Sequence, residues 1–269
     1  MEHYENPQFE DDGRGAYSRP EPWSRGVKGI IIATVSVFVA QIIFSRFSEG
    51  AEFMAWLELW PAAVFERGAV WQLVSYAFLH DTHILMHILF NMLFLYWFGR
   101  AAERVWGTRR FLIFYFCAAA FSGLCYSAWV YTLGSPHPCI GASGAVMACM
   151  MAYALWYPNQ IILLFFIIPM RIRTFVIFTI CIEVYSLLNM ESGIANMAHL
   201  GGLLFGYLVV RAGPRLNHAV TACFRKSAEA IAAEDDRRLD EILDKVHKKG
   251  IGALSWAERR FLKRMGRKR

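Results

Sequence analysis

Ser143 is the residue of this chain best placed to act as a nucleophile. It lies in the sequence Gly141-Ala142-Ser143-Gly144, where a polar loop meets an apolar run that extends to Tyr157. A serine hydroxyl is a poor nucleophile until a base within hydrogen-bond distance takes its proton, and neutral histidine is the usual base at physiological pH. His199 is the candidate base. With its proton taken by His199, the oxygen of Ser143 would attack a carbonyl carbon, as in peptide-bond hydrolysis.

Two further polar side chains could stabilise the oxyanion that this attack creates. His87 and Asn91 are four residues apart in an apolar run, so on a helix they project from the same face. Peptide-bond attack needs hydrogen-bond donors aimed at the developing negative charge. The backbone N–H of Ser143, at the start of a helix, would supply another donor. The sequence therefore predicts an oxyanion site that includes His87 and Asn91.

Four glycines indicate how these groups could be brought together. Gly141 and Gly144 flank Ser143 and let backbone and substrate approach its hydroxyl. Gly202 and Gly206 form a small-xxx-small pattern just after the candidate base, of the kind that lets membrane helices pack closely. Close packing of these two helices would bring the base to the nucleophile.

The composition predicts a membrane protein. Hydrophobic residues make up 56% of the 269 residues and charged residues only 19%, which is more apolar than an average soluble domain. The net charge of +6 comes from Lys and Arg at the ends of apolar runs and near the C-terminus, a distribution that indicates membrane topology rather than a nucleic-acid partner. The six cysteines lack metal-ligand spacing and no H-E-x-x-H motif is present, so we expect no metal and no cofactor.

We expect an all-α polytopic membrane protein with six transmembrane helices. A polar tail over 1–28 reads as disordered, 29–212 as the six-span domain, and 213–269 as a charged helical appendage. The segment 46–83, rich in Trp and acidic residues, would lie in the membrane interface, and 161–168 would connect two spans at the membrane boundary. The spans, each near the ~20 residues that cross a bilayer, are expected at 29–44, 84–99, 111–133, 143–157, 174–188 and 198–210.

The charges of the loops orient this bundle. The loops after the second, fourth and sixth spans are rich in Lys and Arg and the others are poor, so the positive-inside rule predicts that both termini are cytoplasmic. The even-numbered spans then begin on the non-cytoplasmic side, which places His87, Asn91, Ser143 and His199 at similar depth. Polar groups within a membrane are costly and indicate a functional site. We expect that site to open to water on the non-cytoplasmic side.

The C-terminal appendage is predicted to be a small cytoplasmic helical hairpin. Ser255 followed by Glu258 is a capping-box pattern at a helix start. The apolar residues that repeat at helical spacing are Ile242, Leu243, Val246, Trp256, Phe261 and Leu262.

The chain resembles the rhomboid family of intramembrane serine proteases. The matching residues are Gly141-Ala142-Ser143-Gly144, then Ala198-His199-Leu200-Gly201-Gly202 with Gly206, and His87-Ile-Leu-Phe-Asn91. The resemblance covers about 29–212. It departs from the family at Gln72, where Arg often follows the Trp, and at Met147, where an aromatic residue often packs on the catalytic histidine.

The resemblance implies a rhomboid-like six-span bundle with a Ser143–His199 dyad, no acidic third member, and an oxyanion site that includes His87 and Asn91. It implies that the chain cleaves transmembrane segments of membrane proteins near the non-cytoplasmic face, with lateral entry past the second and fifth spans. In a bacterial source the protein would reside in the inner (plasma) membrane. The C-terminal hairpin resembles an appendage of some bacterial rhomboids.

Several alternatives stay open beside this interpretation. A rhomboid-like pseudoprotease would bind membrane clients without cleaving them, and a transporter could use the intramembrane His and Glu side chains as a proton path. His80, His83 and His87 could suggest a metal site, which the absence of a zinc-protease motif disfavours. For Glu183, an acid within the fifth span, we favour a hydrogen bond to a neighbouring span over catalysis. Glu103 is expected to pair or to cap a helix.

Overall fold

The computed structural model describes residues 24–134, 137–164, 167–189 and 195–250, together with 255, 258 and 262. The chain divides into two compact units, Met1–Arg211 and Ala212–Arg269. Most of the predicted N-terminal tail, at 1–23, lies outside the described residues.

Helix α1 (Arg25–Phe44) begins four residues before the first predicted span, and a side chain from another helix caps it. The carboxylate of Glu103 accepts hydrogen bonds from the backbone N–H groups of Gly26, at 2.8 Å, and Val27, at 2.9 Å. Thr108 donates its hydroxyl to the same carboxylate at 2.7 Å. The first four N–H groups of a helix have no partner within it, and the buried carboxylate satisfies two of them. The prediction that Glu103 caps a helix is confirmed.

The segment 46–83 is mostly helical, which we did not predict. A short polar tie holds it together: Gln72 accepts a hydrogen bond from the backbone N–H of Trp60 at 3.0 Å and donates one to the carbonyl of Trp56 at 3.0 Å. Gln72 therefore anchors this segment through two hydrogen bonds to backbone groups, although the resembling family often has Arg at this position. The elements are α2 (Ser48–Leu57), α3 (Pro61–Arg67), α4 (Gln72–Ser75) and the 3₁₀ turn η1 (Tyr76–Phe78).

The second and third predicted spans lie in one long helical stretch with a sharp turn in it. It consists of α5 (Leu85–Phe94), the π-helical segment η2 (Leu95–Gly99) and α6 (Arg100–Thr132). The turn is at Gly107, whose φ of 76° is favourable only for glycine. The second span therefore continues past its predicted end at residue 99 before the chain reverses.

Helix α7 (Ser143–Trp156) has the bounds predicted for the fourth span to within one residue. The connector that follows is a β-hairpin, so the all-α prediction needs this correction. Strands β1 (Ile161–Leu164) and β2 (Ile168–Arg171) pair antiparallel, with Leu163 opposite Pro169. A short run of β-branched residues and Leu ending at a proline is too short and too interrupted for a helix.

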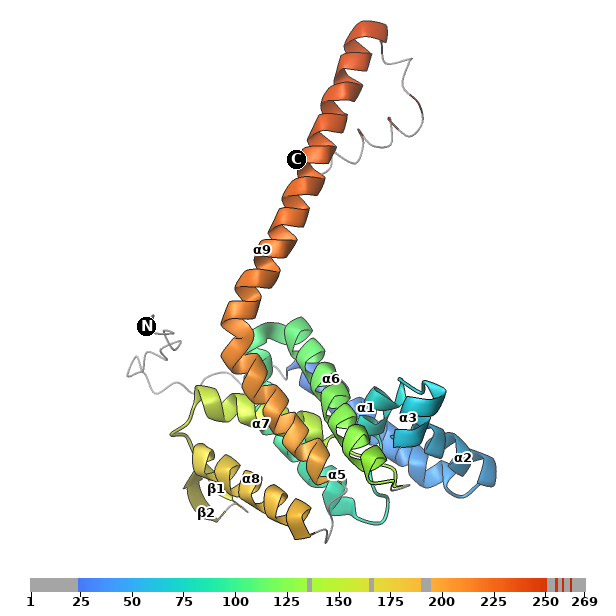
Figure 1. The fold of residues 1–269 in the computed structure, drawn as a ribbon, viewed down its shortest axis with the longest axis vertical. Coiled ribbons are helices and arrows are strands. Elements are labelled where there is room, and N and C mark those ends of the chain that lie inside the picture. Colours follow the sequence, from blue (N-terminus) through green and yellow to red (C-terminus); the bar gives the residue numbers. More distant parts are fainter. Residues whose placement is uncertain are drawn as a thin grey trace. The chain divides into compact units, whose positions relative to one another are not determined.

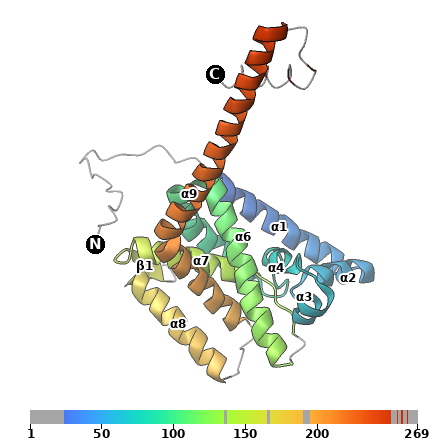
Figure 2. The ribbon, with the colours of Figure 1, turned by 45° about the horizontal axis from the view of Figure 1, so that its top comes forward.

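Helix α8 (Ile172–Asn189) follows the hairpin, and α9 (Asn196–Lys249) runs well beyond the predicted end of the sixth span. Helix α7 forms the centre of the first unit, flanked by α6 and by the first part of α9, whereas α8 and α1 lie at opposite edges (Figures 1 and 2). The residues of α7 that are completely buried are small: Ala148, Cys149 and Ala152. Small side chains at its centre let the neighbouring helices approach closely.

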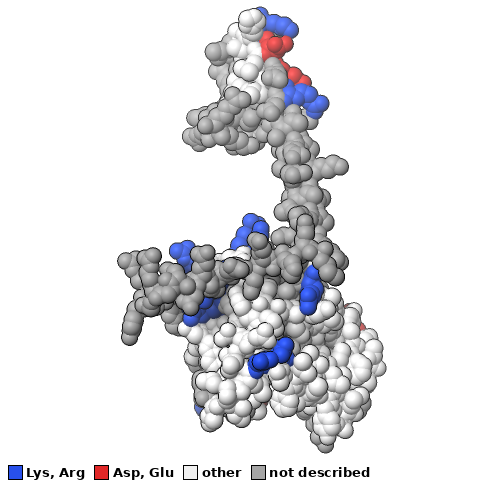
Figure 3. Space-filling view, turned by 90° about the vertical axis from the view of Figure 1, so that its left-hand side faces the viewer, with Lys and Arg blue, Asp and Glu red and all other residues white. Residues whose placement is uncertain are grey.

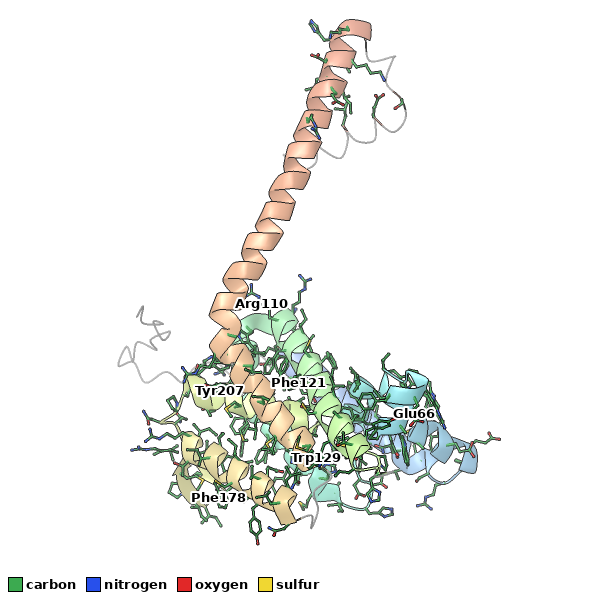
Figure 4. All side chains as sticks on the ribbon, in the orientation of Figure 1. Glu66, Arg110, Phe121, Trp129, Phe178 and Tyr207 are labelled. Atoms are coloured by element: carbon green, nitrogen blue, oxygen red, sulfur yellow. The ribbon has the colours of Figure 1, made fainter. Side chains whose placement is uncertain are left out.

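The outer surface of the first unit is strongly apolar. Ile177, Phe178, Tyr185 and Leu188 of α8 are all more than half exposed, and Figure 4 shows Phe178 on the outer side of that helix. The described part of the face in Figure 3 carries few charged side chains. An apolar surface this extensive is typical of contact with a membrane.

Among the described residues, three helical stretches are long and apolar enough to cross a membrane: Arg25–Phe44, Leu85–Thr132 and Ile172–Asn189. The second of these holds two predicted spans, and Ser143–Trp156 is apolar but shorter. The count of six spans stays a prediction.

The second unit has a small apolar cluster and a polar tie. Ile242 is buried against Leu239, Val246 and Leu262. Lys245 pairs with Glu258 at 2.8 Å. Glu258 also accepts the backbone N–H of Ser255 at 2.7 Å, while Ser255 Oγ accepts the N–H of Glu258 at 3.3 Å, so the predicted capping box is confirmed. Trp256 and Phe261 lie outside the described residues, and the hairpin stays a prediction.

Candidate active site

Ser143 is the first residue of α7, and His199 lies in the first turn of α9. Ser143 Oγ is 2.7 Å from His199 Nε2, which is hydrogen-bond distance for transfer of the hydroxyl proton to the imidazole. The first N–H groups of α7 have no acceptor within the helix, so the backbone N–H of Ser143 is directed at the same end of α7 as its hydroxyl.

Glycines set the distance between the two helices. A Cβ added at Gly202 would collide with the carbonyl oxygen of Gly144, and one at Gly206 with the carbonyl oxygen of Ala148. On the other side of α7, a Cβ at Gly144 would lie 2.6 Å from the Cβ of Ser122 on α6. The backbones of α7 and α9 are therefore in direct contact, which larger side chains would prevent.

The loop before Ser143 is held by the segment 46–83. Leu59 and Cys139 exchange two backbone hydrogen bonds, at 3.1 and 3.0 Å, and Gly141 donates its N–H to the carbonyl of Tyr76 at 2.9 Å. The phenol of the buried Tyr76 in turn donates to the carbonyl of Ala119 on α6. Burial raises the pKa of the Cys139 thiol to about 12, so this cysteine stays protonated and does not compete as a nucleophile.

His87, on α5, faces the same loop. Its Nδ1 accepts a hydrogen bond from the backbone N–H of Asp81 at 3.4 Å, so in the neutral ring the proton is on Nε2. A Cβ added at Gly141 would lie 2.9 Å from that Nε2 and 3.9 Å from Ser143 Oγ. Gly141 has a φ of 126°, a conformation that favours glycine. The missing side chain leaves room for the Nε2–H group beside the serine.

Asn91 is buried one turn further along α5 and donates one N–H of its amide to the carbonyl of His87 at 2.8 Å. A side-chain amide has two such donors. Asn91, His87 and Ser143 line one cavity of about 330 Å³. Its other lining residues are apolar: Met86, Phe90, Phe94, Val146, Met147 and Met150. Met147, where the resembling family often has an aromatic residue, is thus part of the cavity wall.

Glu183, on α8, is a further acidic residue beside the candidate base. Its Oε1 lies 2.8 Å from His199 Nδ1, on the opposite edge of the imidazole from Ser143. The expected hydrogen bond from Glu183 to a neighbouring span is confirmed, but its partner is the candidate base itself. The resemblance implied no acidic third member, whereas the structure places this carboxylate within hydrogen-bond distance of the imidazole. The available signal was an acidic residue within a span, where a charge is costly.

His80 and His83 do not join the serine and His199. His80 is fully buried with its ring 5.0 Å from that of His87; burial and the neighbouring His87 lower the pKa of His80 to about 4, so it is neutral at physiological pH. His83 is exposed. Within the described part of the chain, no three His, Cys, Asp or Glu side chains are grouped so that they could hold a metal ion.

Comparison with known families and proteins gives two family matches. A family model described as Rhomboid domain matches residues 67–214, and one described as a family of unknown function (DUF6576) matches residues 232–268. The second match coincides with the apolar cluster and capping box of the C-terminal unit.

Among individual proteins, Rhomboid protease GlpG of Yersinia pestis (strain Pestoides F) is 29% identical over 185 residues, which cover 67% of this chain and 59% of the relative. GlpG of Yersinia pseudotuberculosis serotype O:3 gives the same values. The RHOMBOID-like protein 12, mitochondrial, of Arabidopsis thaliana is 31% identical over 191 residues, 65% of this chain and 54% of the relative. The matched region thus spans less than two thirds of each of these relatives.

Proposed function

This chain belongs to the rhomboid family, and we propose that it is an intramembrane serine endopeptidase that cleaves transmembrane segments of other membrane proteins. It is an integral membrane protein, in keeping with the family and with its apolar helices. The observation that supports the proposal best is the 2.7 Å contact between Ser143 Oγ and His199 Nε2. This contact is at the edge of a cavity that also holds His87 and Asn91.

In the proposed reaction, Ser143 Oγ attacks the carbonyl carbon of the scissile peptide bond while its proton passes to His199 Nε2. The carbonyl oxygen becomes an oxyanion, for which the Nε2–H of His87, the Nδ2–H of Asn91 and the backbone N–H of Ser143 are the proposed donors. The tetrahedral intermediate collapses, the C–N bond breaks, and His199 gives its proton to the leaving amine. Water then hydrolyses the acyl-enzyme by the same steps, with His199 as the base.

The proposed cleavage site is near the non-cytoplasmic face of the membrane, with both termini of the chain in the cytoplasm. The distribution of Lys and Arg among the loops supports this orientation. A helix hides its peptide bonds in hydrogen bonds, so a substrate segment with small or helix-breaking residues would be cut most readily. Replacing those residues of a substrate by leucine would slow cleavage.

The experiment measures covalent labelling of the detergent-solubilised protein by a fluorophosphonate probe. We expect wild type to be labelled, and Ser143→Ala and His199→Ala to lose at least about 10³-fold in labelling rate. Ser45→Ala, which removes the exposed hydroxyl at the end of α1, and His83→Ala, which removes an exposed histidine, are the matched controls and should react like wild type. A folded wild type that stays unlabelled, while a known rhomboid protease is labelled under the same conditions, would favour the client-binding pseudoprotease.

A further inference from the structure

Glu183 contacts the edge of His199 that faces away from the serine. Glu183 Oε1 and His199 Nδ1 are 2.8 Å apart, and both side chains are largely buried, with exposed fractions of 12% and 19%. A carboxylate only accepts hydrogen bonds, so Nδ1 must carry the proton in this contact. A neutral His199 then has its free lone pair on Nε2, directed at Ser143 Oγ. The contact therefore selects the one tautomer that can accept the serine proton.

The carboxylate also has an electrostatic effect on the proton transfer. When Nε2 takes the proton from Ser143, the ring becomes an imidazolium, and a negative charge 2.8 Å from Nδ1 stabilises it. The other titratable group that faces His199 is His87 on α5, which would disfavour a second positive charge. Cys125 on α6 packs beside the adjacent Gly201 and carries no charge in its thiol form. Glu183 is thus the one described acidic side chain in contact with the imidazole.

The backbone at Glu183 is tied to α9 as well. Asn196, in the first turn of α9, donates its amide to the carbonyl oxygen of Glu183 at 3.2 Å. Helix α8 is otherwise peripheral, since Ile172 and Val176 at its beginning are its buried residues among those described. Two hydrogen bonds, one accepted by the side chain and one by the backbone carbonyl of Glu183, therefore align this part of α8 with the start of α9.

From these contacts we propose that Glu183 is a positioning residue for His199. It fixes the tautomer and ring orientation of the base and stabilises its protonated form, so that the nucleophile is activated by a Ser–His–Glu arrangement rather than by a Ser–His pair. This inference rests on the proposed function. It assigns to a peripheral helix, α8, control over the reactivity of a serine on the central helix α7.

The test compares the fluorophosphonate labelling rate as a function of pH in wild type, Glu183→Gln and Glu183→Asp. Gln keeps the size of the side chain, but it removes the charge and can turn an N–H group toward Nδ1, which favours the wrong tautomer. We expect Glu183→Gln to slow labelling by about 10² to 10⁴-fold. We also expect the pH profile of labelling to differ from that of wild type, because the imidazolium loses its counter-charge. Glu183→Asp keeps the carboxylate and should recover part of the rate and the wild-type pH profile.

Thr179→Val is the matched control, because Thr179 is one turn earlier on α8 and its hydrogen bond among the described residues is to its own helix, at the carbonyl of Phe175. Thermal unfolding of each variant separates a change in reactivity from a loss of folding. If Glu183→Gln does not fold, the labelling rate and pH profile of Glu183→Asp are compared with those of Thr179→Val instead. A rate and a pH profile in the Glu183 variants equal to those of Thr179→Val would overturn the inference and leave the proposed protease intact. A wild type that does not react at all, in the assay that labels a known rhomboid protease, would overturn both.

Discussion

Helix α9 meets α7 and α8 in different ways. Against α7 the contact is backbone to backbone, because Gly202 and Gly206 have no side chain between them and the carbonyls of Gly144 and Ala148. Against α8 the described hydrogen bonds come from side chains, through Glu183 and Asn196. The contact with α7 leaves no room for a larger side chain. The hydrogen bonds to α8, in contrast, can be lengthened or broken by a small movement of one helix.

This difference separates two requirements of the proposed reaction. The glycine contact fixes where the serine and the histidine are, since both are in the first turns of the helices that it joins. The polar contact fixes which way the imidazole faces and which nitrogen carries the proton. Position is thus set by packing in the centre of the unit, and orientation by a helix at its edge.

Among the variants that change helix packing or the serine loop, the largest effect is expected for Gly202→Ala. Its Cβ would collide with the carbonyl oxygen of Gly144, so the two helices must move apart. Such overpacking costs about 1 to 3 kcal/mol of stability, and a displacement of about 1 Å at a reactive pair lowers the rate by about 10²-fold. Thermal unfolding and labelling of Ser143 measure the two effects. Gly29→Ala, where an added Cβ meets nothing within 4 Å, is the control and should leave labelling unchanged.

Gly141→Ala tests the loop rather than the helix contact. The new Cβ would meet His87 Nε2 at 2.9 Å, in a backbone conformation that side chains rarely adopt. We expect labelling to fall by about tenfold to 10²-fold, with a stability cost of about 1 to 2 kcal/mol. Gly134→Ala, at a φ of 63° with open space around its Cβ, imposes backbone strain of a milder kind away from the site. Equal losses of labelling in the two variants would show that strain, not the clash with His87, is responsible.

Asn196→Ala addresses the polar contact while it keeps the carboxylate of Glu183. Loss of one hydrogen bond is worth about 1 kcal/mol, so we expect a fall in labelling of less than about tenfold, smaller than that of Glu183→Gln. The pH profile should stay near that of wild type, because the charge remains. A fall as large as that of Glu183→Gln would mean that the backbone tie, not the carboxylate, sets the orientation of His199.

The smallest effect concerns the polar contact of the C-terminal unit, which is only partly buried. Hydrogen bonds from Lys245 and then Ser255 lower the pKa of Glu258 from its ordinary value of 4.5 to about 2. A lowered pKa stabilises the folded form above about pH 4.5, and this contribution is lost as the pH falls toward 2. Hydrogen exchange of residues 239–262 in the full-length protein, corrected for the intrinsic rate, should show slightly weaker protection at pH 2 than at pH 5. Glu258→Gln should remove most of that difference.

The sequence was sufficient to predict the helix starts that carry Ser143 and His199 and the close approach of these two side chains. Ser143 begins α7 as predicted, because small residues and a loop precede a long apolar run, and the glycines at 202 and 206 indicated the close contact with α9. These features are local, or repeat along one helix. Both kinds of pattern can be recognised without knowing how the helices are placed in space.

The contact between Glu183 and His199 could not be predicted in the same way. The two residues are 16 positions apart, and which faces of α8 and α9 meet depends on the angle and shift between the helices. The role of the segment 46–83 was hidden for a similar reason. Leu59 and Tyr76 hold the serine loop through backbone atoms, so their side chains gave no sign of it. The β-hairpin, in contrast, had a local signal in Pro169 that we underestimated.

The cap on α1 has a consequence for biosynthesis. The N–H groups of Gly26 and Val27 depend on a carboxylate that follows them in the chain by 77 and 76 residues. At 5 to 20 residues per second, a ribosome needs about 4 to 15 s to add that many residues. During this interval the nascent α1 has no Glu103, and its first turn must use water or lipid headgroups instead. The start of α1 therefore reaches its final form only after the helix that carries Glu103 has been synthesised.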